Sequence, residues 1–265
     1  ILRDAPFAAL LDVGLSGRWS DFSTVGSLEN YKIDASWAPV STVRFRASMS
    51  TATRAPNIGE LFSPQGEGFP GSTDPCAAEG SPTPDVAAIC QATGVPASDV
   101  GSLALNLPAG QVRQLSGGNP DLAEEEADTW TAGVVFTADN MDLSVSVDYF
   151  DIEIEGFISP FGGGANNVLN TCYDASNPLG GIGSPFCDAI KRRSDGTIEA
   201  VSVTSQNVAL QTLNGFDVAA QYRFDALGGQ WGINYIATFT EESDFTPFAG
   251  AEVIECAGKY GNDCG

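Results

Sequence analysis

Apolar and polar residues alternate with a period of two along most of the regular parts of the chain, as in strands with one apolar and one polar face. The clearest run extends from Met141 to Tyr149, where every second residue is apolar. The run 129–137 precedes it across the short turn 138–140. Further strands are expected at 31–37 with 43–49, at 216–224 with 231–239, and near 8–20. The pattern predicts an all-β, antiparallel up-and-down meander of about seven or eight strands.

The connections between these strands alternate between short and long. Short turns follow Trp37, Thr137 and Phe224, whereas the connections 54–127, 158–200 and 243–265 are long. In a meander successive connections alternate ends, so all short turns share one rim. Such asymmetry is typical of transmembrane β-barrels with short periplasmic turns and long extracellular loops. A soluble β-sandwich would show the same alternation, but its strands average about 5 or 6 residues and those expected here have about 10 to 15.

Six cysteines lie in the long connections as three close pairs, Cys76 with Cys90, Cys172 with Cys187, and Cys256 with Cys264. Six cysteines allow about fifteen pairings, and the spacing favours disulfides between neighbours. Each bridge would stiffen one loop that has no core of its own, which stabilises it by roughly 3 kcal/mol in the chain-entropy model. Disulfides indicate a compartment outside the cytosol. The chain has no histidine and no CxxC motif, so we predict no metal site.

Composition excludes several classes of protein. The net charge of −22 comes from 34 acidic and 12 basic residues and argues against a nucleic-acid partner. Apolar runs are far shorter than the roughly 20 residues of a membrane-spanning helix, although a spanning strand needs only about 10. Without histidine there is no Ser/His/Asp or Cys/His arrangement, and we predict neither an enzyme nor a cofactor. No signal peptide is visible from Ile1 onward, so an extracytoplasmic protein would be mature or incomplete.

Several ordered motifs resemble the β-barrel of TonB-dependent outer-membrane receptors. Residues 54–62, RAPNIGELF, resemble a family signature in which a strand ends before a loop. Then follow GNPDL at 118–122, the acidic run 124–126 and DTWT at 128–131. Two later stretches also resemble strands of the family, DYFDIEI at 148–154 and NGFD at 214–217. The resemblance covers about residues 8–245 and rests on the order of these motifs.

The resemblance implies the cell outer membrane and uptake of a scarce ligand, energised by the TonB complex acting on a plug domain. The family's plug and energy-coupling box are missing from this sequence, and a complete barrel of this size class has about 22 strands. We therefore expect residues 1–265 to be one partial barrel domain, an internal segment without the plug and the C-terminal strands. Ferric siderophores, cobalamin and saccharides fall within the family's range. Haem is disfavoured, because no histidine lies between the motifs at 54–62 and 118–122.

Six residues are candidates to contact an anionic ferric chelate through charge-assisted hydrogen bonds: Arg54, Asn57, Arg113, Lys191, Arg192 and Arg193. Ordinary loop charges or structural bonds at a strand end are the alternative for each of them. Two other functional classes stay open from the sequence. One is a secreted all-β binding or adhesion module with disulfide-stapled loops, and the other is an extracellular glycoside hydrolase, which needs two carboxylates about 5 to 10 Å apart.

Overall fold

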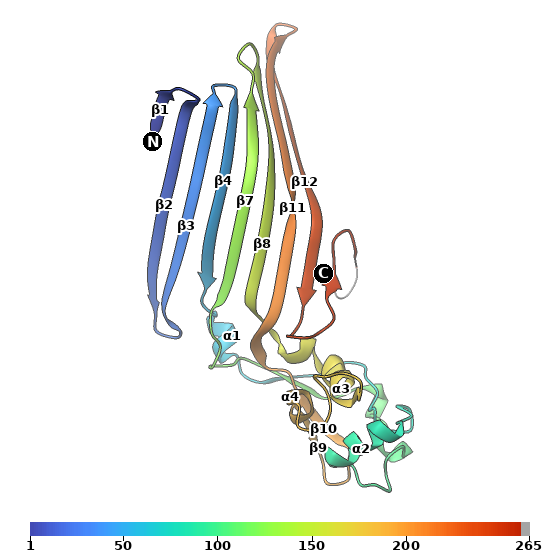
Figure 1. The fold of residues 1–265 in the computed structure, drawn as a ribbon. Helices are drawn as coiled ribbons and strands as arrows, with labels where there is room; N and C mark the ends of the chain where they lie inside the picture. Colours follow the sequence, from blue (N-terminus) through green and yellow to red (C-terminus); the bar gives the residue numbers. More distant parts are fainter. Residues whose placement is uncertain (261–265) are drawn as a thin grey trace.

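A tall curved sheet and a smaller folded unit at one of its ends make up the structure (Figure 1). The structure is a computed structural model and describes residues 1–260. Within these residues nine strands form one antiparallel sheet in the order β1-β2-β3-β4-β7-β8-β11-β12-β13. The seven long strands are β2 (Ala8–Phe22), β3 (Gly26–Val40), β4 (Val43–Arg54), β7 (Glu125–Thr137), β8 (Asp142–Pro160), β11 (Ser205–Ala226) and β12 (Gly229–Thr246). Short strands β1 (Leu2–Ala5) and β13 (Ile254–Glu255) lie at the two edges.

Each long strand pairs with its neighbours in chain order, so the predicted meander is confirmed. The sheet remains open, because β1 and β13 lie at opposite ends of the strand order. Turns 41–42, 138–141 and 227–228 lie on one rim, and connections 55–124 and 161–204 leave from the other, as Figure 1 shows. The predicted separation of short turns from long loops is therefore present.

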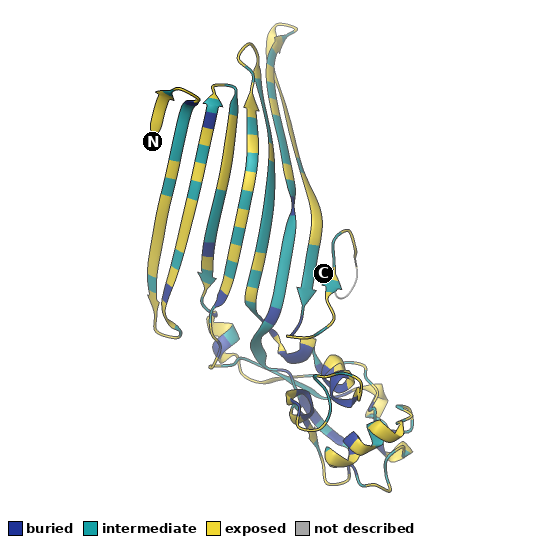
Figure 2. Cartoon of the chain, in the orientation of Figure 1, coloured by how far each residue is buried: buried dark blue, intermediate teal, exposed yellow. Residues whose placement is uncertain are grey.

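The register gives the sheet two chemically different faces. A row across six strands joins Trp37, Phe45, Val134, Val147, Val218 and Ala237 on one face. The chain neighbours of four of these residues form the adjacent row, on the opposite face of the sheet: Arg46, Gly133, Asp148 and Asp217. Large apolar side chains of the first face remain exposed, Leu15 at 79% and Trp19 at 65% among them. The alternating bands of exposure along the strands follow this pattern (Figure 2).

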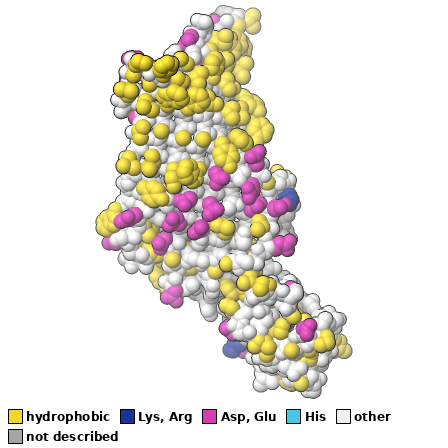
Figure 3. All heavy atoms as spheres, in the orientation of Figure 1, with side chains coloured by type: hydrophobic (Ala, Val, Ile, Leu, Met, Phe, Trp, Pro, Cys, Tyr) yellow, Lys and Arg dark blue, Asp and Glu magenta, His cyan; other side chains and the backbone are white. Residues whose placement is uncertain are grey.

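The apolar face changes character toward the long loops. Figure 3 shows hydrophobic side chains over the part of the sheet near the short turns and acidic side chains over the part nearer the loops. The register aligns Asp128 with Glu153 and Trp130 with Asp151 on neighbouring strands. Glu242 and Asp244 continue the same side of the sheet on β12. None of the helices within residues 1–260 has the length and apolar character needed to cross a membrane.

The two long connections fold together into one body, here called the loop unit, which consists of 55–124 and 161–204 (Figure 1). Its α-helices are α1 (Ile58–Phe62), α2 (Pro84–Ala92), α3 (Ala165–Tyr173) and α4 (Pro185–Asp188). Its 3-10 helices are η1 (Leu103–Leu105), η2 (Pro108–Gly110) and η3 (Phe161–Gly163). Its sheet has the order β5 (Gly66–Gly68), β6 (Gln114–Ser116), β10 (Ile198–Ser202) and β9 (Ile190–Arg192). Strands β6 and β10 pair in parallel and join the two connections.

The disulfides Cys76–Cys90 and Cys172–Cys187 form between sequence neighbours. Their sulfur-bearing residues belong to one hydrophobic core that draws on both connections, with Leu105, Val112, Val168, Leu169 and Val201 among its most buried members. Neither bridged loop forms a core by itself, as expected, but the bridges do not stiffen two independent loops: the two connections share one core, and β6 pairs with β10 between them. The third expected pair, Cys256 with Cys264, includes a residue that lies outside the described residues.

Candidate functional site

The junction between the sheet and the loop unit is built around Arg54, the last residue of β4. Its guanidinium donates to both carboxylate oxygens of Glu125, at 2.5 and 2.7 Å, and to both of Glu60, at 3.0 Å. Glu125 also accepts from the backbone N–H of Ile158 at 2.8 Å and is 5% exposed. The arginine thus ties the ends of β4, β7 and β8 to the start of the loop unit.

Helix α1 begins at this junction with a capping box. The Asn57 side chain accepts from the backbone N–H of Glu60, and the Glu60 carboxylate accepts from the backbone N–H of Asn57. Such reciprocal bonds satisfy two N–H groups that a helix start leaves unpaired. Desolvation raises the pKa of Glu60, but the hydrogen bonds from Arg54 and the Asn57 backbone outweigh it, so the pKa lies below its ordinary value. The motif RAPNIGELF at 54–62 therefore has a structural role, because it connects the end of β4 to the capped start of helix α1.

Two asparagines close the other side of the junction. The backbone N–H of Asn119 donates to the Glu60 backbone carbonyl, and the Asn119 side-chain amide donates to the Ser205 carbonyl. Asn207 binds the backbone of Ala123 with both its amide oxygen and its amide nitrogen. Three apolar side chains, Leu61, Leu122 and Ile158, pack into a small separate core beneath them. The loop unit is consequently attached to β4, β7, β8 and β11 by defined contacts.

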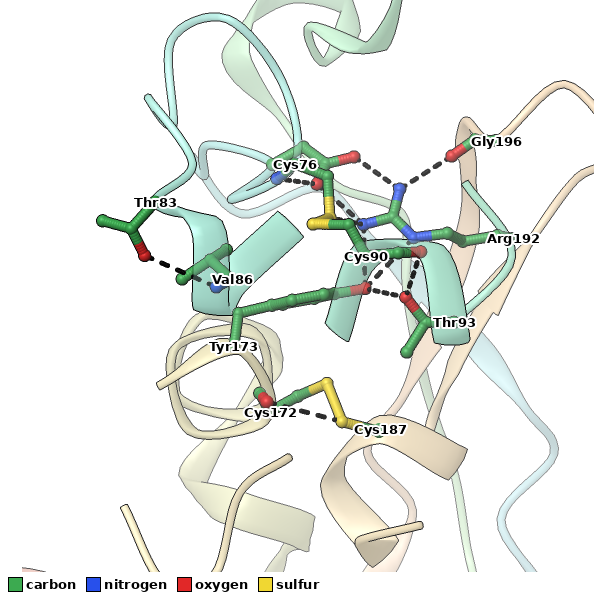
Figure 4. The surroundings of a disulfide bond; sticks show 11 residues. Cys76, Thr83, Val86, Cys90, Thr93, Cys172, Tyr173, Cys187, Arg192 and Gly196 are labelled. Carbon is green, nitrogen blue, oxygen red and sulfur yellow. Dashed lines mark hydrogen bonds and ion pairs between the residues drawn. A yellow bond between two sulfur atoms is a disulfide. The ribbon is translucent and has the colours of Figure 1, made fainter. Parts of the chain in front are cut away.

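Inside the loop unit, Arg192 and Asp74 form an ion pair with almost no exposure, 1% and 0% for the two side chains. Both guanidinium terminal nitrogens reach the carboxylate at 2.7 Å, and Arg192 also donates to the Gly196 carbonyl and the Tyr173 hydroxyl. Figure 4 shows the guanidinium beside the Tyr173 ring and next to the Cys76–Cys90 disulfide. The Tyr173 hydroxyl lies 2.8 Å from the Thr93 hydroxyl, which extends the network to helix α2.

This geometry corrects one of the candidate ligand contacts. Arg192 lies inside the loop unit with its donors directed at Asp74, Gly196 and Tyr173, so it has no surface to offer a ligand. The physical reason is that β9 alternates its side chains, and Arg192 faces inward while Lys191 and Arg193 face solvent. Its role is to hold the first long connection against the second.

A hollow of about 470 Å³, here called the loop pocket, lies on the loop unit. The first connection supplies one wall and the β9–β10 hairpin the other, and the lining residues are Phe69, Ala104, Leu105, Asn106, Leu107, Pro108, Ala109, Gln111, Arg113, Arg193, Thr197, Ile198 and Glu199. Most of these side chains are apolar, and two are arginines. Its volume lies within the range of about 300–1,000 Å³ that small-molecule pockets have.

Three of the candidate contacts gather at this pocket. Arg113 and Arg193 line it, and Lys191 pairs with the lining residue Glu199 at 3.1 Å. Arg113 donates to Glu67, and Arg193 donates to the Ile198 carbonyl at 3.2 Å. Arg54 and Asn57 do not join them, since they lie at the junction.

Sequence reasoning missed several residues of this region. Asp74 and Tyr173 gave no signal, because their partner Arg192 lies 118 and 19 positions away along the chain, too far for a local pattern. Phe69 and the turn at Ala109 belong to polar, Gly/Pro-rich stretches without periodicity, so no pattern marks them as pocket walls. Only the clustering of Lys191, Arg192 and Arg193 drew attention to the hairpin.

Comparison with known protein families gives a match over nearly the whole chain. Residues 5–256 match the family described as TonB dependent receptor-like, beta-barrel. A search of the curated proteins found no match.

Solved structures with a similar fold are those of larger transport receptors. The siderophore receptor PirA from Acinetobacter baumannii has 15% sequence identity and a TM-score of 0.50, with coverage of 88% of this chain and 26% of that one. A mutant of the ferric enterobactin receptor PfeA from Pseudomonas aeruginosa, solved in complex with enterobactin, has 17% identity, a TM-score of 0.49, and coverage of 86% of this chain and 24% of that one. The RagAB peptide transporter has 15% identity, a TM-score of 0.45, and coverage of 91% and 21%. The chain spans about a quarter of the length of such receptors.

Proposed function

The chain belongs to the TonB-dependent receptor β-barrel family, and from this premise we propose that it forms part of the wall of an outer-membrane active transporter. In this proposal the transporter binds a scarce small molecule of the ferric siderophore, cobalamin or saccharide class. It imports that ligand with energy derived from the TonB complex, which acts through a plug domain. The polar face of the sheet is the surface against which such a plug would pack.

One observation carries the proposal, namely the two-faced wall of seven long strands. A wide apolar face with exposed Val13, Leu15, Trp19, Ile33 and Trp231 suits lipid. A soluble, secreted binding module would leave a patch of this kind in water, which soluble monomers avoid. The chemistry of the face therefore favours the membrane wall over the secreted module. No observation on the described residues favours a glycoside hydrolase, and the family and the similar structures are transport receptors.

The orientation follows from the loops. We propose that the short turns face the periplasm and that the loop unit faces the outside, where it meets the ligand first. Arg54, Asn57, Arg113, Lys191 and Arg193 stay candidates for ligand contact. Among them Arg113 and Arg193 carry the proposal best, because both line one pocket. Arg54 and Asn57 already use their polar groups at the junction.

The proposal is tested by uptake. Cells that lack the gene and cells that carry it are supplied with radiolabelled ferric chelates, cobalamin and oligosaccharides, with and without a protonophore that removes the energy source of the TonB complex. We expect the gene to support accumulation of one ligand class, and the protonophore to abolish it. Equal accumulation in both strains for every ligand would refute the transport function.

A further inference from the structure

We propose that the tips of the short turns are a lipid-contact surface, which inserts into the head-group layer of the periplasmic leaflet. This inference rests on the proposed function, since it takes the sheet as a membrane wall with its short turns on the periplasmic side. It goes beyond that function, because a turn that only connected two strands would lie in water. The contact would fix the height at which the wall sits in the membrane.

Two of the short turns present a large apolar side chain at their tip. Leu227 is 97% exposed and Phe7 is 87% exposed, more than any large apolar side chain on the long strands. The turns 41–42 and 138–141 also have an exposed apolar residue, Val40 directly before the first and Met141 within the second. Turns in water usually carry Gly, Asn, Asp, Ser or Pro. The rim therefore offers an apolar surface where contact with water alone would favour polar residues.

The backbone at these two tips does not favour the residues that occupy it. Leu227 has a φ of 52° and Phe7 a φ of 60°, in the left-handed region where a Cβ is crowded. Leu227 and Gly228 form a two-residue turn with positive φ at both positions, and Asn, Asp or Gly is preferred at the first of them. Phe7 follows Pro6 in a two-residue turn whose second position prefers Gly. Neither side chain helps its own turn, so the explanation for both lies in what they contact.

A tryptophan from the apolar face of the sheet holds each tip. The indole N–H of Trp37 donates to the Phe7 carbonyl at 3.0 Å. The indole N–H of Trp231 donates to the carbonyl of Ala226, the residue before Leu227, at 2.9 Å. Both tryptophans lie on the face that the proposed function assigns to lipid. Because tryptophan is enriched at the boundary between membrane and water, these two hydrogen bonds favour turn tips at that boundary over tips further out in the periplasm.

The height of the apolar band supports the same level. On β12 the lipid-side residues run from Trp231 to Phe239, and on β2 they run from Leu11 to Trp19, eight positions in each case. At about 3.3 Å per residue and a strand tilt of about 40°, eight positions span about 20 Å along the membrane normal. The apolar band of a membrane barrel is about 25 Å tall, so the strands alone are too short by about 5 Å.

The missing height lies on the side of the short turns. Acidic residues follow the band at its other end, Asp21 two positions after Trp19 and Glu241 two positions after Phe239. Carboxylates oppose insertion into lipid. Counted from the two tips instead, the band has twelve positions on both strands and spans about 30 Å. The tips then reach the head-group layer, and Figure 3 shows hydrophobic side chains continuing toward that end of the sheet.

The test measures the surroundings of the tips in the intact receptor that carries this chain, reconstituted into bilayers of phosphatidylethanolamine and phosphatidylglycerol. A nitroxide is attached to the single introduced cysteine of Leu227→Cys or Phe7→Cys. Its collisions with oxygen, which concentrates in lipid, are compared with its collisions with a water-soluble nickel complex. Within residues 1–260 no cysteine is free to react, and the unsubstituted receptor, treated in the same way, gives the background.

Two reference positions calibrate the measurement. Ile233→Cys in the middle of the apolar face is the reference for lipid, and Leu103→Cys, at an exposed leucine of the loop unit, is the reference for water. Heat-modifiability gels report folding of every variant. Met141→Cys lies at a turn without a left-handed residue and gives a further reading at the same rim if a tip variant does not fold.

We expect both tip labels to collide more with oxygen than with nickel, as the Ile233 label does and as the Leu103 label does not. In bilayers of short-chain lipid, thin enough to match the strands alone, the tip labels should change to the nickel-accessible behaviour of the Leu103 label, because the mismatch leaves the tips outside the lipid.

Nickel-accessible tips together with an oxygen-accessible Ile233 label would overturn the inference and leave the membrane wall standing. Tips that stay oxygen-accessible in the thin bilayers would overturn the argument from height. Tips shielded from both reagents would indicate contact with protein in place of lipid, which also overturns the inference. A nickel-accessible Ile233 label in the folded receptor would instead refute the membrane wall and with it the proposed function.

Discussion

The buried pair of Asp74 and Arg192 gives the sharpest prediction about stability. Asp74→Asn changes almost no volume but removes the negative charge that faces the guanidinium. The amide can offer one oxygen to Arg192, and its NH₂ group then points at guanidinium donors that reached the carboxylate at 2.7 Å. Arg192 has 1% exposure, so water cannot replace the lost partner. Breaking a buried pair from one side costs about 3–5 kcal/mol.

The loss of stability caused by Asp74→Asn should be confined to the loop unit. The pair connects the first connection with the second, so its loss should destabilise segments 55–124 and 161–204 against local unfolding. Hydrogen exchange of backbone amides measures that free energy site by site. A change of 3–5 kcal/mol lowers protection between about 10² and 10⁴-fold, at 1.36 kcal/mol for each factor of ten. Amides in β2 and β3 are far from the pair and should keep their wild-type protection.

The matched control is a substitution of Lys191, the chain neighbour of Arg192. Lys191 also forms an ion pair, with Glu199, but its side chain is 72% exposed. Lys191→Met should therefore change protection of the loop unit by less than about 1 kcal/mol, the usual range for exposed pairs. The reasoning is refuted if Asp74→Asn and Lys191→Met have equal small effects. It is also refuted if Asp74→Asn lowers protection in β2 and β3 as much as in the loop unit.

Two further predictions concern the sheet and the junction. A Cβ on Gly133 would collide with the Asp148 carboxylate, so Gly133→Ala should cost about 1–3 kcal/mol and lower the yield of folded barrel in heat-modifiability gels. Gly232→Ala is the control, because a Cβ there meets no atom closer than 4.0 Å, and an equal yield for both variants would contradict the packing argument. The pKa of Glu60 lies below its ordinary 4.5 in the folded state, so its contribution to stability is complete above pH 4.5 and is lost as the pH falls through the lowered value. Protease cleavage near α1 should rise over that acid range in the wild type and show a weaker pH dependence in Glu60→Gln, and identical pH profiles would refute the role of Glu60.

The strands could be predicted from the sequence because their signal is local. In the part of β8 from 142 to 154 the register is continuous, so the side of each residue follows from its parity, as the run from Met141 to Tyr149 indicates. The short turns also carry local signals, and so the segregation of loops to one rim could be derived. The edge strands β1 and β13 were not expected, because Leu2–Ala5 and Ile254–Glu255 are too short to display a period.

The loop unit could not be predicted, because its contacts join residues far apart in the chain. Asp74 and Arg192 each look like an ordinary loop charge, and only their meeting across 118 positions makes them a buried pair. The same applies to the core, which collects single apolar residues from stretches that are polar on average. Arg193 and Lys191 could be proposed as ligand contacts from their charge, but nothing local separated them from Arg192.

The loop pocket keeps its shape only if both connections fold as one body, because each connection supplies one of its two walls. Phe69 and Arg113 belong to the first connection, whereas Arg193 and Glu199 belong to the second. On two independent loops these walls would drift apart, and the affinity would be reduced by the fraction of time spent in other arrangements. The parallel pairing of β6 with β10 and the shared core prevent this drift. Under the proposed function, substitutions in that core should therefore weaken ligand binding at the pocket even where they touch none of its lining residues.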